Sequence, residues 1–141
     1  MLIRDVNDHA RLIETEVTHL LNSNKIGDAV TTAEEFLDNN PKVHNATSMR
    51  VSLCLALINA NNLKQCAEVF ASVNKQLPMN ASLKSSIRFI DANLLQADGK
   101  LQEAAELFLR VGQTSNDKKL IVPSLYKAGV AFERTQQFKS A

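Results

Sequence analysis

The chain has 141 residues, a formal net charge of +1, and only four glycines and three prolines. This length suffices for one compact domain or a short stack of repeats, and the scarcity of glycine and proline favours a nearly all-helical structure. The near-neutral charge argues against a general nucleic-acid or anionic-membrane surface. No stretch reaches the roughly 18 apolar residues of a membrane-spanning helix, and the N-terminus lacks the apolar core of a signal peptide. We therefore expect a cytoplasmic protein, with the nucleus as the alternative compartment.

The hydrophobic pattern predicts helices that come in pairs. In chain order they cover residues 3–21, 26–38, 46–58, 63–76, 82–96, 101–111 and 123–132. Short polar turns separate the two members of each pair, at residues 22–25, 59–62, 97–100 and 134–137. The last of these helices is expected to begin near Pro123, because proline suits the first turn of a helix.

The pairs recur in phase along the chain. Two sets of equivalent residues share the offsets 37, 38 and 37: Ile26, Leu63, Leu101 and Phe138, and Ala29, Cys66, Ala104 and Ala141. A fixed period in this range indicates stacked two-helix repeats that need a neighbour to bury their apolar faces. We expect one domain over residues 1–141, with repeats at 3–41, 45–78, 82–116 and an incomplete 122–141. The second helix of the incomplete repeat would contain only residues 138–141, and so short a helix is not stable by itself. We therefore also expect the chain to be a fragment of a longer protein.

Small residues are expected where paired helices approach most closely, since they permit a short distance between helix axes. They form pairs twelve residues apart: Val17 with Ala29, Cys54 with Cys66, Ala92 with Ala104, and Gly129 with Ala141. An apolar stripe follows on the second helix of each pair, formed by Ala33, Phe36, Phe70, Val73, Phe108 and Val111.

This slot pattern resembles the tetratricopeptide repeat. The eleventh slots are apolar and the thirty-second slots are proline, with Leu20, Leu57, Leu95 and Phe132 in the first set and Pro41 and Pro78 in the second. The match is degenerate: the period exceeds the family's usual length of about 34 residues, and the family's tryptophan is replaced by Ile13, Arg50, Arg88 and Leu125. The resemblance implies an all-α, right-handed α-solenoid of antiparallel helix pairs with about three and a half repeats. Repeats of this length are also similar to the helical arms of scaffold subunits in proteasome-lid, signalosome and initiation-factor complexes.

The resemblance places a partner-binding groove on the first helices of the pairs. Carried onto this chain, it implies a partly apolar trough with basic flanks, formed by Val51, Leu55, Phe89, Asn93, Tyr126 and Val130 together with Arg50, Arg88 and Lys127. Asn93 alone matches the set with which some relatives clamp a peptide's terminal carboxylate, so an apolar helix or extended segment is the expected ligand. The alternative is that neighbouring repeats cover these residues.

Residue types that carry chemistry are sparse. Cys54 and Cys66 are expected to face each other and are interpreted as small buried apolar residues, because a disulfide would need an oxidising compartment. The three histidines, His9, His19 and His44, show no metal-binding spacing, although Asp5 and His9 can share a helix face. Asn45 and Asn80 lie in glycosylation-type triplets, but each precedes a predicted helix and is interpreted as an N-cap.

The sequence offers no nucleophile motif, phosphate loop or paired carboxylates in an apolar setting, so we expect no catalytic residue, cofactor or metal. The one basic doublet, Lys118 and Lys119, has no aromatic companions, so nucleic-acid binding is not expected. The leading hypothesis is a non-enzymatic interaction module or scaffold that binds a protein or peptide. The alternatives are a structural arm of a multisubunit complex, and a regulatory domain that senses a ligand near Asn93. Self-association through the last repeat is a further expectation.

Overall fold

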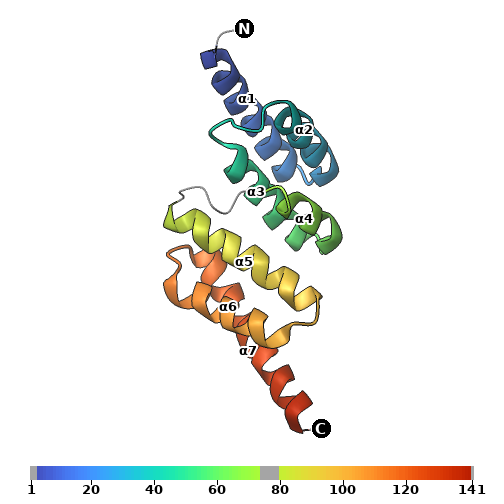
Figure 1. Cartoon of the computed structure of the whole chain (residues 1–141), viewed down its shortest axis with the longest axis vertical. Helices are drawn as coiled ribbons and strands as arrows, with labels where there is room; N and C mark the ends of the chain where they lie inside the picture. The colour runs from blue at the N-terminus through green and yellow to red at the C-terminus, as the bar shows by residue number, and fades with distance from the viewer. Residues whose placement is uncertain (1–2, 74–79, 141) are drawn as a thin grey trace. The chain divides into compact units, whose positions relative to one another are not determined.

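A computed structural model describes residues 3–73 and 80–140 of the chain (Figure 1). Over these two ranges the backbone forms seven α-helices and no strand. The prediction of an all-α fold is therefore confirmed for this part of the chain. The chain divides into two compact units, Met1–Lys75 and Gln76–Ala141, and each is described by itself.

The first unit contains α1 (Ile3–Asn22), α2 (Ile26–Asn39), α3 (Ala46–Asn59) and α4 (Leu63–Phe70), drawn from blue to green in Figure 1. Each helix packs on the next, and α1 also contacts α3. The turns before α2 and α4 pass through Asn24 and Asn61, each with φ 59°. Asparagine tolerates this left-handed conformation better than most residues, which is why three-residue polar connections suffice here.

The second unit contains α5 (Ala81–Ala97), α6 (Leu101–Thr114) and α7 (Lys118–Ser140). α6 packs on both α5 and α7, which also contact each other. The turn from α5 to α6 uses Gly99 at φ 81°, a conformation that favours glycine. Gly112 permits a close approach of α6 to α7, because a Cβ added there would clash with the side chain of Leu125.

The interior of each unit follows the predicted small-residue pairs. Three of the four pairs are fully buried: Val17 and Ala29, Cys54 and Cys66, and Ala92 and Ala104. The predicted apolar stripe is buried as well, at Ala33, Phe36, Phe70, Val73, Phe108 and Val111. These predictions are confirmed, and they show that helical spacing alone can identify core residues.

The fourth predicted helix pair is wrong, because a single helix, α7, takes its place. α7 begins five residues before Pro123 and runs as one helix through the predicted turn at 134–137 and past residue 138. Its early start has a local cause: Asp117 Oδ1 accepts the Lys119 N–H at 2.9 Å, and Ser115 Oγ accepts the Asp117 N–H at 3.0 Å. The predicted turn contains no glycine, proline or asparagine, and its residues are compatible with a helix.

Gly129 is the described member of the fourth small-residue pair. It is exposed, and a Cβ added there would meet no atom of the described structure. Its expected partner, Ala141, lies outside the described residues. Gly129 therefore does not mark a close helix contact.

Helix boundaries elsewhere agree with the sequence prediction within one residue for α1, α2, α3 and α5, and α6 extends three residues further than predicted. α4 is the exception, because it ends at Phe70 instead of Gln76. Ser72 lies just beyond the end of α4, and its carbonyl accepts a hydrogen bond from Arg50 Nη1 at 3.4 Å. Residues 74–79, which include Gln76 and Pro78, lie outside the described residues.

The two asparagines predicted as N-caps behave differently. Asn80 Oδ1 accepts the Leu83 N–H at 2.8 Å, which confirms its role at the start of α5. Asn45 makes no capping bond; its buried carboxamide donates through Nδ2 to the Ala10 carbonyl of α1 at 3.0 Å. The N-cap prediction for Asn45 is wrong, because the packing of α1 against the start of α3 draws this side chain inward.

Candidate functional site

The residues of the predicted groove fall into both units. Arg50 and Val51 are buried and Leu55 is half-buried on α3 of the first unit. The second unit holds the others, with Arg88, Phe89 and Asn93 on α5 and Tyr126, Lys127 and Val130 on α7. The two sets are therefore considered separately.

Arg50 is an interior residue, which corrects its predicted place on the flank of the groove. Its Nε lies 3.6 Å from Oε1 of Glu34 on α2, a charge contact longer than a hydrogen bond. Its Nη1 donates to Ser72 beyond the end of α4. Arg50 thus joins α2, α3 and the segment after α4, and its side chain offers little surface to a partner.

Phe89 also belongs to the interior. Its side chain is 6% exposed, and its ring meets that of Phe108 edge to face, with centroids 5.8 Å apart. The Lys127 Nζ lies over both rings, 5.2 Å from the Phe89 centroid and 5.6 Å from that of Phe108. This differs from the prediction of an open trough at Phe89, because Lys127 and α6 cover the ring.

Lys127 and Asn93 form the polar contact between α5 and α7. The Lys127 Nζ donates to Asn93 Oδ1 at 2.5 Å, and Asn93 Nδ2 donates to the Phe89 carbonyl at 2.8 Å. Burial lowers the pKa of Lys127 from its ordinary value. Of the predicted groove residues, the structure thus brings Phe89, Asn93 and Lys127 together in one cluster, in which Phe89 and Asn93 are buried and Lys127 is half-buried.

An exposed apolar surface lies along α7. Val122 and Tyr126 are 70% and 73% exposed and lie one turn apart, and half-buried Val130 follows one turn later. We call these three residues the α7 face. Val122 was missed at the sequence level because the helix was predicted to begin at Pro123; a helical start at Lys118 would have placed it in register with Tyr126.

Basic side chains lie at both ends of the α7 face. Lys119 precedes Val122 by three residues, and Arg134 follows Val130 by four, spacings that keep them on the same side of a helix. Both side chains are exposed. Glu133 is an exposed acidic residue nearby, so the surface has mixed charge with a basic excess.

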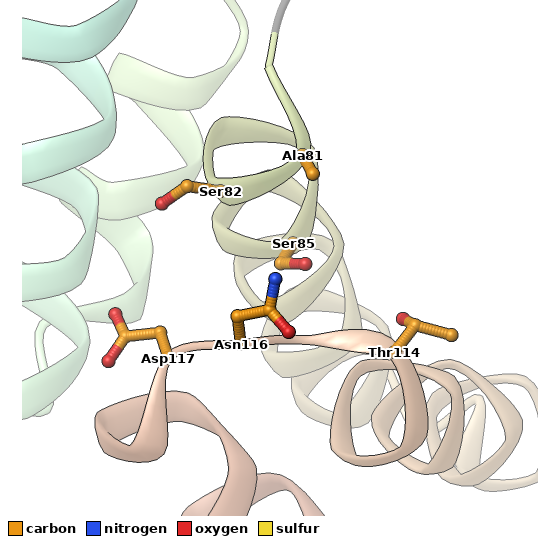
Figure 2. Close-up of a pocket in the computed structure, with 6 residues that line it drawn as sticks. All are labelled: Ala81, Ser82, Ser85, Thr114, Asn116 and Asp117. Carbon is orange, nitrogen blue, oxygen red and sulfur yellow. The ribbon is translucent and has the colours of Figure 1, made fainter.

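A separate pocket lies in the second unit, where the first turn of α5 meets the end of α6 and the connection to α7 (Figure 2). Its volume is about 220 Å³, and it is lined by Ala81, Ser82, Ser85, Thr114, Asn116 and Asp117. Sequence reasoning did not find it, because it depends on how the connection after α6 packs against α5. The ligand-sensing hypothesis had placed a pocket near Asn93, which is instead buried and bonded to Lys127.

The cysteine pair lies within the first unit. Cys54 Sγ and Cys66 Sγ each approach the other residue's carbonyl oxygen, at 3.8 and 3.7 Å, and both thiols are free and buried. The prediction that they face each other is confirmed. A hydrogen bond to Cys66 and burial both raise the pKa of the Cys54 thiol, which disfavours the reactive thiolate.

The histidines and acidic residues form no metal centre in the part of the chain that the structure describes: no three or more His, Cys, Asp or Glu side chains are grouped to hold an ion there. Exposed His9 packs against Phe36, with ring centroids 5.0 Å apart, and the Asp5 side chain lies outside the described residues. Among the described helices, none combines the length and the apolar character that crossing a membrane requires. Comparison of the chain with protein-family models, with curated proteins and with solved structures finds no match.

Proposed function

We propose that this chain is a non-enzymatic protein-interaction module that binds an amphipathic helix of a partner along the α7 face. The observation that carries the proposal is the exposure of Val122 and Tyr126 one turn apart on a single helix. Single apolar residues are common on protein surfaces, whereas apolar residues in helical register are typical of helix-docking surfaces. Tyrosine is also among the residues that contribute most to binding at interfaces.

The charges around the α7 face favour a partner helix with acidic residues beside its apolar stripe. Lys119 and Arg134 lie at the two ends of the face, and both are exposed. Such charges steer association and set orientation more than they add affinity. The second unit as a whole holds nine basic and six acidic residues, which is consistent with this preference.

The α7 face is preformed, which lowers the entropic cost of docking. The opposite side of α7 is anchored in the unit by four buried residues, Leu120, Ser124, Ala128 and Ala131. Lys127, bonded to Asn93, fixes the helix rotation from the side. A partner would therefore meet a helix already held in one orientation.

The packing within each unit supports a related proposal about architecture: the helices are tetratricopeptide-like pairs stacked as a right-handed α-solenoid. In both units the second helix packs on the first and the third, which also touch each other. Stacked two-helix repeats have this contact pattern. The uninterrupted α7 means that the proposal now rests on three helix pairs and one further helix.

A photo-crosslinking amino acid tests the proposed function. We expect that, placed at Tyr126 in cells, it captures a partner at a segment with helical apolar spacing and acidic flanks. The matched control position is Leu12, an equally exposed apolar residue on α1 without an apolar neighbour one turn away. Once a partner is captured, Tyr126→Ala should weaken its binding about tenfold or more, whereas Leu12→Ala should not. Identical products from the two positions, or equal affinities of the two variants, would overturn the proposal.

The second candidate function is a structural arm of a multisubunit complex, with contacts along the edges of the helices. Leu125 and Gly129, also exposed on α7, widen the apolar surface beyond one stripe and favour this alternative. In that case Leu125→Asp should affect assembly as strongly as Tyr126→Asp. Sedimentation of the purified chain at increasing concentration, wild type against both variants, separates the two candidates if self-association occurs through this surface.

A further inference from the structure

We propose that the α7 face binds the same face of a second copy of this chain, with the two α7 helices antiparallel. This inference rests on the proposed function, because it names the helix that occupies the α7 face. In this arrangement Lys119 of each copy lies opposite Glu133 of the other, and Tyr126 lies at the centre.

Residues on one side of α7 are arranged symmetrically about Tyr126. Val122 precedes Tyr126 by four residues, and Val130 follows it by four. Lys119 precedes it by seven residues, and Glu133 follows it by seven. Both spacings return to the same side of a helix, because four residues make slightly more than one turn and seven make nearly two. The five residues therefore lie along one line on the surface of α7.

The two ends of this line carry opposite charges. Lys119 and Glu133 are both exposed, and neither makes an ion pair with a residue that the structure describes. An antiparallel second copy reverses the order of the residues, so it places each lysine opposite a glutamate. A parallel copy would place like charges opposite each other, which disfavours that orientation. The charge pattern of α7 is therefore complementary to itself in the antiparallel orientation.

The middle of the line is apolar, as in the contact line between paired helices. Val122 and Tyr126 are both largely exposed, so a second helix placed there would bury apolar surface. The antiparallel register places Val122 of each copy opposite Val130 of the other. Gly129, one turn after Tyr126 at the edge of the line, is exposed and has open space where a Cβ would lie. The small residue permits a short distance between the two helices.

Further charges limit the affinity of this pairing. Lys118 and Arg134 are exposed and lie eight residues before and after Tyr126, further to the side than Lys119 and Glu133. An antiparallel copy brings these two basic residues toward the same end of the interface, where exposed like charges repel weakly. The exposed lysine–glutamate contacts therefore select the orientation, and the apolar centre supplies most of the affinity.

Intrinsic fluorescence reports on the centre of the proposed interface, because Tyr126 is the one tyrosine of the chain and the sequence has no tryptophan. We expect analytical ultracentrifugation of the full chain at low salt to show a monomer–dimer equilibrium. Over the same concentration range, acrylamide quenching of the tyrosine fluorescence should fall about twofold or more, because the second copy covers the ring. Dimerisation elsewhere on the chain would leave the quenching unchanged.

Charge reversal tests the register of the two helices. Lys119→Glu and Glu133→Lys should each weaken self-association about tenfold or more at low salt, because both lysine–glutamate contacts become repulsive. An equimolar mixture of the two variants should associate within about threefold of the wild type, since an antiparallel heterodimer again pairs opposite charges. Lys64→Glu is the matched control and should leave self-association unchanged. Lys64 is likewise an exposed lysine at the second position of its helix, α4.

Three results would overturn the inference: a chain that stays monomeric up to about 1 mM, a dimer in which the quenching of Tyr126 is unchanged, or a mixture that associates no better than the single variants. Capture of a different protein through Tyr126 by a monomeric chain would also overturn self-pairing, but it would support the proposed function. The failure of this inference and the failure of the proposed function are therefore distinguishable.

Discussion

Lys127 on α7 reaches across to Asn93 on α5, donating through Nζ to Oδ1 at 2.5 Å while it lies 5.2 Å above the Phe89 ring centroid. The cation is thus held by a neutral amide and by aromatic faces. An ammonium group in such a site gains cation–π attraction but loses hydration. Burial lowers the pKa of Lys127, so the loss of hydration is the larger of the two effects.

The lowered pKa predicts a dependence of stability on pH. Between the pKa of Lys127 in the folded state and its ordinary value of 10.5, the unfolded chain binds more protons. The free energy of unfolding should therefore rise with pH across this window, and below it the contribution of Lys127 should not change with pH. We expect urea unfolding at a series of pH values to show this rise for the wild type relative to Lys127→Met. Parallel pH profiles for the two proteins would contradict the prediction.

Two glycines predict opposite effects of the same substitution. Gly129→Ala should raise the free energy of unfolding by up to about 1 kcal/mol, because alanine favours helix and the added Cβ meets open space. Gly112→Ala should lower it by about 1–3 kcal/mol, because Leu125 must move. In a Leu125→Ala background, Gly112→Ala should become neutral or stabilising. Thermal and urea unfolding compare these four variants with the wild type, and a Gly112→Ala penalty that persists without the leucine side chain would show that another contact is responsible.

The Arg50 and Glu34 pair predicts non-additive losses. Their side chains are 11% and 27% exposed, so either charge left alone lacks full hydration. We expect Glu34→Gln to destabilise the first unit by about 1–3 kcal/mol, somewhat less than a fully buried pair would lose. The double variant Glu34→Gln, Arg50→Met should lose less than the sum of the single variants. Strict additivity in the double-mutant cycle would mean that the two side chains do not interact.

The cysteine pair predicts protected thiols. Cys54 and Cys66 are both fully buried, and the hydrogen bond to Cys66 with burial raises the pKa of Cys54. A thiol reagent should react with them at least about a hundredfold more slowly than with a cysteine introduced at exposed Leu12, because reaction requires local opening. Low urea should accelerate only the buried pair. Equal rates at all three positions would show that the pair is accessible in the folded state.

The sequence pattern predicted the secondary structure well where turns contain glycine or asparagine. Asn24, Asn61 and Gly99 all adopt positive φ at predicted turns. The turn predicted at residues 134–137 is helical instead, and the polar side chains of Arg134 and Gln136 are exposed on the surface of α7. Polar residues alone do not end a helix; a residue that favours a non-helical backbone is needed.

The site was harder to predict than the fold. In the tetratricopeptide repeat, which the sequence resembles, the slots of Arg50 and Phe89 would face a groove. Here the carboxylate of Glu34 on α2 covers Arg50, and the ammonium group of Lys127 covers Phe89. Which side chain covers another depends on contacts between different helices in the folded chain. The spacing of residues along one helix holds no information about these contacts. Tyr126 remained exposed because the neighbouring elements of its unit pack on the other side of α7.

Arg50 has a consequence for how the first unit melts. α4 has eight residues, too few to be stable as an isolated helix. Its end is tied through Ser72 to a guanidinium that also faces Glu34 on α2. When α4 detaches, the Arg50 guanidinium loses its hydrogen bond to Ser72. Because this guanidinium also contacts Glu34, the loss of stability extends to α2 and α3. The shortest helix should not fray first; it should melt together with α2 and α3 in a single transition.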